Sequence, residues 1–292
     1  MNFRQLTLGT LSLLTVATAF GCGQPGVMSP TLMGMAQAPN TINAMGVSRK
    51  LGFDWNRYQN VDARTARPAH LPRQAMLPSH VDLRDQMPPV YDQGQLGSCS
   101  AFSIAKGFRE WLERKEGQGD TQLSALFFYY AERKDQGTVS QDSGSTITEG
   151  FKVLQNVGVA PDRDWSYDIA KFAEEPPAKA FKDAAAYKIH SATQLSNLDD
   201  VKTALAGGSA VSFGFLVHAS FQGIGSDGMM PMPKRNDKVE GGHAVLAVGY
   251  DDAKKVLIVR NSWSSGWGDS GYFYMPYAYV TAKNTADFWT GQ

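Results

Sequence analysis

The chain has 292 residues, of which 42% are hydrophobic and 19% charged, a composition typical of a folded soluble protein rather than a disordered one. Lys and Arg together number 28, as do Asp and Glu, so the formal net charge is zero. A neutral chain has no basic field to hold nucleic acid, and no zinc-type Cys/His spacing is present. We therefore expect no nucleic-acid partner, no metal and no cofactor.

The first 21 residues have the form of an export signal. Arg4 precedes an uncharged, largely apolar run over residues 6–20, which is too short to cross a bilayer as a helix. We expect residues 1–21 to be a signal peptide that takes the protein out of the cytoplasm.

Two cleavage sites compete at the end of this signal. Ala17-Thr18-Ala19 fits the small-x-small site of ordinary signal peptidase, which would release a secreted protein. Ala19-Phe20-Gly21-Cys22 resembles a bacterial lipobox, although Ala19 replaces the usual Leu and Phe20 is bulky for its place. We favour the lipobox, in which Cys22 becomes the lipidated first residue of a membrane-anchored lipoprotein.

Cys22 and Cys99 are the only cysteines of the chain. A structural disulfide between them is one interpretation. A lipidated Cys22 has no free sulfur to pair, however, and Cys99 is then the lone free thiol of an exported protein. That situation points to reactivity rather than to packing.

Residues 22–76 lack a clear helical or strand period. No charged side chain occurs from residue 5 to residue 48, and the part after Cys22 is rich in Gly, Pro, Met and Ala. We expect a flexible tether here. Charge returns over residues 49–76, which contain Leu51-Gly52-Phe53-Asp54-Trp55; this passage is either a short pro-segment laid across the domain or more linker.

The folded domain is expected to run over residues 77–292 and to begin with helices. Apolar residues recur at helical spacing over residues 99–116, 123–134 and 146–157, and glycines follow the first and third of these stretches. Residues 77–188 are therefore predicted to form a helical half.

The second half, residues 189–292, changes to strand-like patterns. After a short helix near residues 198–206, runs rich in β-branched and aromatic residues occupy 210–217, 244–250, 255–260 and 271–275. The order of the two halves predicts an α+β fold with a cleft between them as the natural place for a site.

Cys99 stands at a loop-to-helix junction. The polar, Gly-rich stretch Gln93-Gly94-Gln95-Leu96-Gly97-Ser98 runs into it, and helical spacing follows. The start of a helix favours the thiolate, which is the nucleophilic form of cysteine. The alternative is a buried structural cysteine, since free cysteine is among the most buried residue types.

Three other residues are candidate partners for Cys99. His243 follows Gly241-Gly242 at the mouth of a strand, Asn261 ends another strand beside Trp263, and Gln93 precedes Cys99 by six residues. Such residues also occur as ordinary packed or turn residues. Together they give a nucleophile, a base, a residue that orients the base, and an amide donor for an oxyanion.

The order Cys, His, Asn, with His243 lying 144 residues after Cys99, resembles papain-like cysteine peptidases, in which the His follows the Cys by about 130 to 150 residues. The matching motifs are Gln93-x-x-x-x-Ser98-Cys99-x-Ala101-Phe102, Gly242-His243-Ala244-Val245-x-x-Val248-Gly249-Tyr250 and Asn261-Ser262-Trp263-x-x-Gly266-Trp267-Gly268-x-x-Gly271-Tyr272. The resemblance covers residues 77–292 and is greatest to the bacterial and archaeal branch. It implies a papain-like fold with a helical half, a β-barrel-like half and a cleft between them.

The resemblance also implies roles for individual residues. Cys99 would be the nucleophile, His243 its proton partner and Asn261 the residue that orients His243. Trp263 would shield that hydrogen bond, and Gln93 would form the oxyanion hole with the Cys99 N–H. Further residues would bind substrate: the main chain at Ser143, Gly144 and Ser145, and the pocket for the second residue before the cut at Ala244 and Phe213.

Three positions depart from the family pattern. Leu96 replaces a cysteine of a common disulfide, Ser100 replaces the aromatic residue that usually follows the nucleophile, and Gly242 replaces an acidic or polar residue. None of these changes removes a catalytic group.

The sequence therefore predicts an exported cysteine endopeptidase that acts on peptides or proteins through a thioester acyl-enzyme. Two other functions stay open. A transpeptidase or peptide ligase would use the same residues, and a papain-fold binding protein would not need them. The sequence carries no signal of an oligomeric state.

Overall fold

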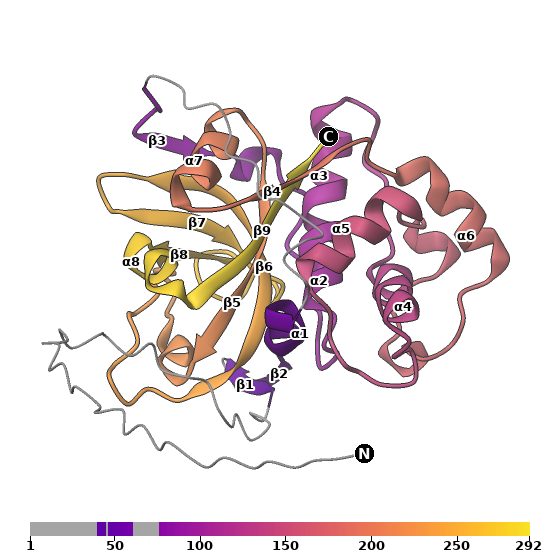
Figure 1. Ribbon diagram of the computed structural model, residues 1–292, viewed down its shortest axis with the longest axis horizontal. Coiled ribbons are helices and arrows are strands. Elements are labelled where there is room, and N and C mark those ends of the chain that lie inside the picture. The colour runs from indigo at the N-terminus through magenta and orange to yellow at the C-terminus, as the bar shows by residue number, and fades with distance from the viewer. Residues whose placement is uncertain (1–39, 45, 61–75) are drawn as a thin grey trace, which may run out of the picture. The chain divides into compact units, whose positions relative to one another are not determined.

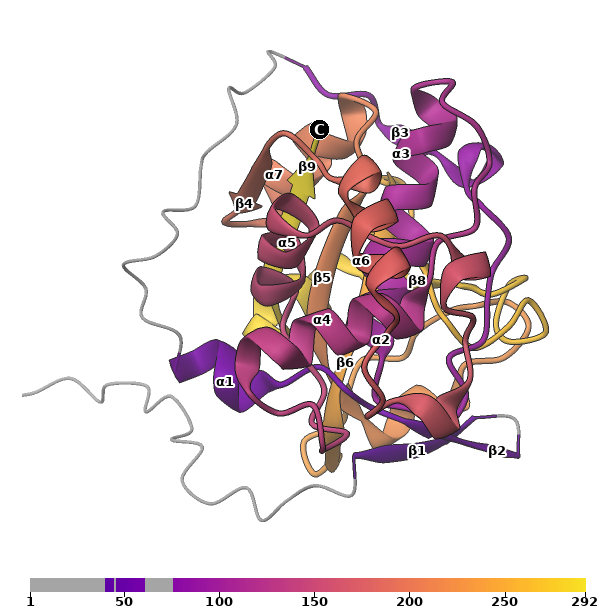
Figure 2. The same ribbon diagram turned by 90° about the vertical axis from the view of Figure 1, so that its right-hand side faces the viewer.

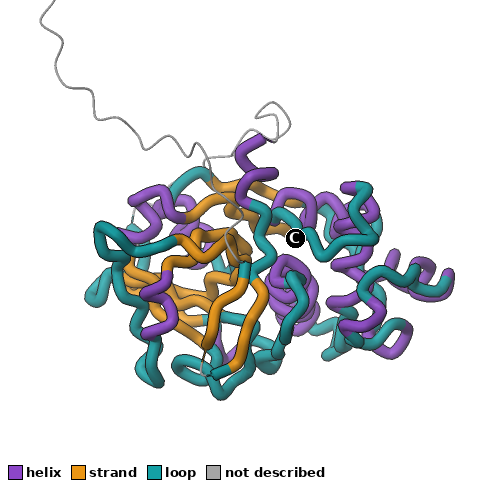
Figure 3. The backbone as a smooth tube through the Cα atoms, turned by 90° about the horizontal axis from the view of Figure 1, so that it is seen from below, coloured by secondary structure: helices purple, strands orange, loops and turns teal. Residues whose placement is uncertain are grey.

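Helices and strands separate into two regions in the computed structural model, which describes residues 40–44, 46–60 and 76–292 (Figure 1; Figure 3). All of these residues belong to one compact unit. Helices dominate the chain between residues 99 and 187, and strands dominate from residue 192 onward. The architecture is α+β, and the prediction is confirmed.

The helical region is built around a helix that begins at Cys99. The segments α2 (Cys99–Ala101), the π-helical η2 (Phe102–Arg109) and α3 (Glu110–Lys115) follow one another without a break. α4 (Ala125–Gln136) and α5 (Ile147–Asn156) contact α2 and η2 (Figure 2). Each of the two begins at a hydroxyl cap, because the side chains of Ser124 and Thr146 accept main-chain N–H groups of the first turn.

Short helical elements complete this region. They are η1 (Arg84–Gln86), η3 (Asp162–Asp164), η4 (Ile169–Lys171), α6 (Ala178–Ala184) and η5 (Ala185–Tyr187). Four more lie among the strands: α7 (Leu198–Ala206), η6 (Ala219–Gly223), α8 (Tyr277–Tyr279) and η7 (Val280–Asn284).

A seven-stranded antiparallel sheet forms the other region. Its order is β4-β9-β5-β6-β7-β8, with β3 paired to β6. The strands are β3 (His80–Asp82), β4 (Ala192–Leu195), β5 (Val211–His218), β6 (Val239–Asp251), β7 (Val256–Arg260), β8 (Tyr272–Pro276) and β9 (Thr285–Gly291). β3 lies within the half predicted to be helical, so residues 80–82 belong to the sheet instead.

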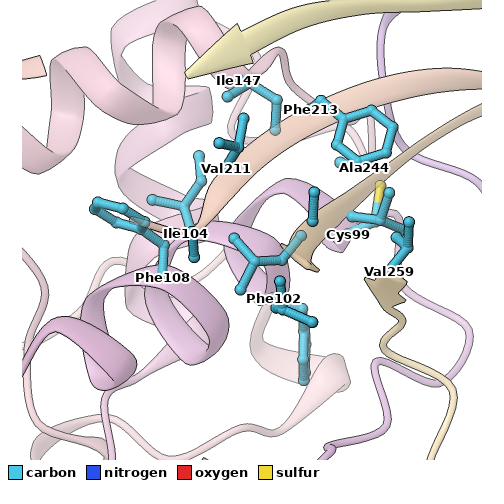
Figure 4. Packing of buried hydrophobic residues seen from close by; sticks show 14 of the residues in the cluster. Cys99, Phe102, Ile104, Phe108, Ile147, Val211, Phe213, Ala244 and Val259 are labelled. Carbon is cyan, nitrogen blue, oxygen red and sulfur yellow. The ribbon is translucent and has the colours of Figure 1, made fainter. Parts of the chain in front are cut away.

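The hydrophobic core lies where the Cys99 helix and α5 meet the sheet. Figure 4 shows Ile104 and Phe108 of η2 with Ile147 of α5 and Val211 of β5, all fully buried. This packing fixes the start of α2 against β6, and η2 against both β5 and β6, the central strands of the sheet.

Part of residues 22–76 forms strands and a helix, so the prediction of a flexible tether is wrong for that part. β1 (Thr41–Ala44) and β2 (Val47–Lys50) form an antiparallel hairpin, and α1 (Trp55–Asn60) follows. The reason is burial: Ile42 and Ala44 alternate with exposed neighbours and join the core. The signal peptide, Cys22 and residues 23–39, 45 and 61–75 lie outside the described residues.

Candidate active site

Cys99 is the first residue of α2, and none of its surface is exposed to solvent. Figure 4 shows its sulfur beside Ala244 of β6. Burial raises the pKa of the Cys99 thiol to about 12, while hydrogen bonds from the main-chain N–H groups of Ala244 and Gly52 lower it by less. Burial therefore outweighs the advantage that a helix start gives the thiolate, and the thiol is neutral near pH 7 in this covered state.

His243 lies on β6 immediately before Ala244 and is also fully buried. Its Nε2 atom is 2.8 Å from Oδ1 of Asn261, and the same oxygen accepts the main-chain N–H of Ser262 at 2.8 Å. The second ring nitrogen, Nδ1, has no hydrogen-bond partner among the residues that the structure describes. Burial lowers the pKa of His243 to about 4, and the bond to Asn261 opposes that change.

Trp263 covers the bond between His243 and Asn261. Its ring stacks on the imidazole at a centroid distance of 4.9 Å and an interplanar angle of 26°. Phe215 of β5 meets the imidazole edge-on at 5.7 Å. These rings keep water from the pair, so the His243–Asn261 bond lies in an apolar surrounding where it is strengthened.

Gln93 is fully buried and its side-chain amide is held at both ends. Oε1 accepts the hydroxyl of Ser262 at 2.6 Å, and Nε2 donates to the carbonyl of Leu96 at 3.0 Å. Nε2 also donates to the carbonyl of Lys50 at 3.1 Å. The amide is therefore fixed with its donor towards a peptide carbonyl, as an oxyanion donor has to be.

Lys50, one of the two residues whose carbonyls accept from Gln93, belongs to a segment that pairs with residues 143–145, the predicted strip for substrate main chain. Ser145 donates its N–H to the carbonyl of Gly52 at 2.9 Å and accepts the N–H of Asp54 at 2.9 Å. Phe53 and Ser145 thus form a parallel bridge. Gly144, with φ of +74°, leaves no room for a side chain here, because a Cβ would lie 2.0 Å from the Gly52 carbonyl oxygen. The hydroxyl of Ser143 is instead 2.9 Å from that of Thr138.

Phe53 fills the predicted side-chain pocket. Its ring packs on Gly214 of β5 so closely that a Cβ on Gly214 would lie 2.3 Å from the ring, and its N–H donates to the carbonyl of Gly242 at 2.9 Å. Ala244 pairs with Gly214 across the two strands and shares its face of the sheet.

The prediction that Phe213 lines this pocket is wrong. Neighbouring residues on a strand point to opposite faces, so Phe213 points away from the face that Gly214 presents to Phe53. Phe213 stacks on Phe288 of β9 at 5.1 Å. The residue of β5 that lines the pocket is Gly214, one position after the predicted Phe213.

Two ion pairs hold the same segment at the cleft. Arg49 Nη1 is 2.5 Å from Asp92, and Lys50 Nζ is 2.6 Å from Asp142. Asp142 also accepts the N–H of Gly97, in the loop before Cys99, at 3.1 Å. Residues 49–54 therefore cross Cys99, Gln93 and the pocket in one continuous run.

Besides Gly214, the cleft contains Gly52 and Phe53, which no motif of the sequence places there. The available signal was the apolar pair Leu51 and Phe53 around a glycine within a charged passage. Such a pattern indicates burial without showing against which surface.

A family model for the papain family of cysteine proteases matches residues 77–286. The chain belongs to this family. It is accordingly a cysteine-type peptidase, and the resemblance drawn from the motifs is confirmed.

Other members share much of this papain-family chain. Xylellain, a cysteine protease from Xylella fastidiosa, is 37% identical, with a TM-score of 0.74 over 83% of this chain and 95% of its own. A peptidase C1-like protein of Acanthamoeba polyphaga mimivirus is 41% identical over 68% of each chain. Cysteine proteinase 1 of Entamoeba histolytica is 30% identical over 68% of this chain and 63% of its own length.

Leu96 and Gly242 have structural explanations in this papain-family domain. Leu96, in place of a disulfide cysteine, is buried in the core. Gly242 is in contact with the crossing segment, since a Cβ there would lie 2.3 Å from the carbonyl oxygen of Phe53.

Across 40–44, 46–60 and 76–292, no helix is long and apolar enough to span a membrane. Within those ranges, no cluster of three or more His, Cys, Asp or Glu side chains could hold a metal ion.

Proposed function

We propose that this papain-family peptidase is an exported endopeptidase that cleaves peptide bonds through Cys99, His243 and Asn261. The observation that carries the proposal is the orientation of His243. Its Nε2 is bound to Asn261, and its free Nδ1 belongs to a residue adjacent to Ala244, whose N–H reaches the Cys99 sulfur. A proton carrier for a thiol needs a ring nitrogen of this kind, which no other group among the described residues occupies.

In the proposed reaction, His243 takes the thiol proton and the Cys99 sulfur attacks the carbonyl carbon of the scissile bond. The negative charge on the carbonyl oxygen is stabilised by Gln93 Nε2 and the Cys99 N–H. His243 returns the proton to the leaving amine as the C–N bond breaks, which leaves a thioester on Cys99. A water molecule deprotonated by His243 then hydrolyses the thioester and restores the thiol.

The segment over residues 49–54 acts in this proposal as a pro-segment that blocks the site. An N–H group, that of Gly52, faces the sulfur where a substrate would place a carbonyl carbon. The carbonyl next to Gln93 belongs to Lys50, in a different peptide unit. The group that the segment presents to the sulfur and the carbonyl that it presents to Gln93 therefore belong to different peptide units, which is how we expect an inhibitor rather than a substrate to bind.

The Phe53 pocket supports a preference for substrates with a large apolar side chain at the second residue before the cut. Gly214 and Ala244 occupy little volume on that face, and Phe53 itself is 4% exposed. An aromatic ring buried in this way contributes about 1.5–3 kcal/mol of binding free energy, enough for selection among side chains.

A peptide-library assay with the full chain under reducing conditions tests the proposal. We expect cleavage after a lag in which the segment leaves the cleft, with a large apolar residue two positions before the cut. An epoxysuccinyl thiol reagent should stop cleavage and add its mass to Cys99. A folded chain that cleaves no peptide, and whose Cys99 the reagent leaves unmodified, would support a binding protein instead. If an added amine captures most of the acyl group, the enzyme is a transpeptidase.

We also propose that the mature protein is anchored outside the cytoplasm by a lipid on Cys22, with secretion as the alternative. The support is the sequence Ala19-Phe20-Gly21-Cys22 after an apolar run. Expressed in a bacterium, the wild-type chain should fractionate with membranes and the Cys22→Ser chain should not. Equal membrane retention of both chains would exclude the lipid anchor.

A further inference from the structure

A buried acid lies against the nucleophile helix and takes no part in the proposed chemistry. Glu132 of α4 has no surface exposed to solvent. Its Oε2 atom accepts the hydroxyl of Ser100 at 2.8 Å, and Ser100 directly follows Cys99. Its Oε1 atom has no hydrogen-bond partner in the described part of the chain. Glu132 is therefore joined to the first turn of α2 by one hydrogen bond.

Charged and titratable groups face Glu132 from its own helix and from two other elements. α2 presents Cys99, and α5 presents Glu149, which is ion-paired with Lys152 at 3.2 Å. Arg133 follows Glu132 on α4 itself.

The residue of η2 that lies near Glu132 is Ile104, which is apolar. A Cβ on Gly150 of α5 would lie 2.2 Å from Ile104 Cδ1 and 2.7 Å from Glu132 Oε1. The unpartnered oxygen thus faces hydrocarbon and a main chain packed too tightly for a methyl group. An ionised carboxylate is poorly solvated in such a place.

The protonation of Glu132 follows from these surroundings. Burial raises the pKa of Glu132 to about 8, with a smaller rise from Glu149; the Ser100 hydroxyl and Arg133 oppose it. The acid is therefore mostly neutral near pH 7. Once ionised, it raises the pKa of the Cys99 thiol.

We propose that Glu132 is a positioning residue for Cys99. Glu132 anchors the first turn of α2 through Ser100, and its ionised form destabilises the Cys99 thiolate. The inference rests on the proposed role of Cys99 as nucleophile. It also explains Ser100, which stands where the family pattern has an aromatic residue. In place of an aromatic packing contact, the Ser100 hydroxyl donates a hydrogen bond to the buried Glu132.

The pH dependence of kcat/KM for peptide cleavage, measured on the full wild-type chain and on Glu132→Gln, tests the inference. Gln keeps an oxygen for Ser100 and does not ionise. We expect wild-type activity to fall above about pH 8 while the variant stays active, so that the variant exceeds wild type by about threefold or more near pH 9 and matches it within about twofold near pH 6. Profiles of identical shape would overturn the inference, because a purely structural role changes the level and not the shape.

Glu149→Gln provides a second variant with a directional outcome. It removes the charge that adds to the rise of the Glu132 pKa, and it keeps a residue type suited to the third position after the Thr146 cap. The alkaline fall should move to lower pH in this variant and be absent when Glu132→Gln is added. A fall that stays in place, or that persists in the double variant, contradicts the role of Glu132.

Thermal unfolding separates this inference from the proposed function. Between pH 4.5 and about 8 the unfolded chain loses the Glu132 proton while the folded chain keeps it, so wild-type stability falls as pH rises through this window. The gain in Tm of Glu132→Gln over wild type should therefore be near zero at about pH 4.5 and several degrees near pH 8. A gain that is equal at both values refutes a neutral buried acid even if no peptide is cleaved, whereas absence of cleavage by a folded wild-type chain refutes the proposed function.

Discussion

A single methyl group on Gly52 is expected to free the active site. A Cβ on Gly52 would lie 1.9 Å from the carbonyl oxygen of Gly97 and 2.4 Å from its carbonyl carbon. These are main-chain atoms two residues before Cys99, so they do not yield as the end of a flexible side chain would. Overpacking of this kind costs about 1–3 kcal/mol or more, which lowers the occupancy of the cleft by the segment about 10- to 100-fold.

The full chain with Gly52→Ala should accordingly cleave peptides without a lag. Its Cys99 should react with an epoxysuccinyl reagent about 10- to 100-fold faster than in wild type. Gly223→Ala is the matched control, because a Cβ at Gly223 meets no atom within 4 Å, and we expect no change from it. If Gly52→Ala is folded and reacts at the wild-type rate, the segment does not control access to the thiol.

Regular elements with local signals could be predicted from the sequence. The short helix near residues 198–206 coincides with α7, whose start is fixed by the Asn197 side chain that accepts the N–H of Asp200. The helix expected over 123–134 is α4, displaced by two residues because Ser124 rather than Leu123 supplies the cap. Caps and apolar spacing are local, so the sequence carries them.

Strands that depend on distant partners could not be predicted in the same way. β9 (Thr285–Gly291) contains Asp287 with φ of +59°, and this residue interrupts any regular alternation. Its carboxylate accepts the N–H of Thr148 at 2.9 Å, a contact made 139 residues away in the chain. β1 and β2 likewise form because Ile42 and Ala44 pack into the hydrophobic core. Tertiary contacts decide such elements.

The residues of the candidate site differ in the same way: some stand in local motifs, and the place of the others depends on distant contacts. Cys99, His243, Asn261 and Gln93 stand in short motifs whose order alone suggested a shared site. The crossing of Gly52 over Cys99 depends on pairing with Ser145 and on room left by Gly97 and Gly144. The difference between Phe213 and Gly214 is one of strand phase, which becomes visible only when the register of β5 against β6 is known.

Removal of the Cys99 thiol is expected to have the largest effect of all. Within the described residues Cys99 is the free cysteine, and the proposed reaction forms its covalent intermediate on that sulfur. Ala fits the space that Cys99 occupies, so the fold and the His243–Asn261 bond should persist. Loss of a nucleophile from such a group lowers kcat by about 10⁴-fold or more, because the remaining residues do not act independently.

Cys22→Ser is the matched control for this change. It removes the other sulfur of the chain at a position that the proposed chemistry does not use. We expect it to leave cleavage by the purified protein unchanged, so that loss of activity in Cys99→Ala is not a general consequence of removing a cysteine.

The most direct measurement is the initial rate of peptide-library cleavage by two purified full chains, one with Gly52→Ala alone and one with Cys99→Ala added. Both chains have the same opened cleft, so they differ only in the sulfur. We predict rapid cleavage by the first chain and a rate indistinguishable from background for the second. Equal rates would contradict the assignment of Cys99 as the nucleophile.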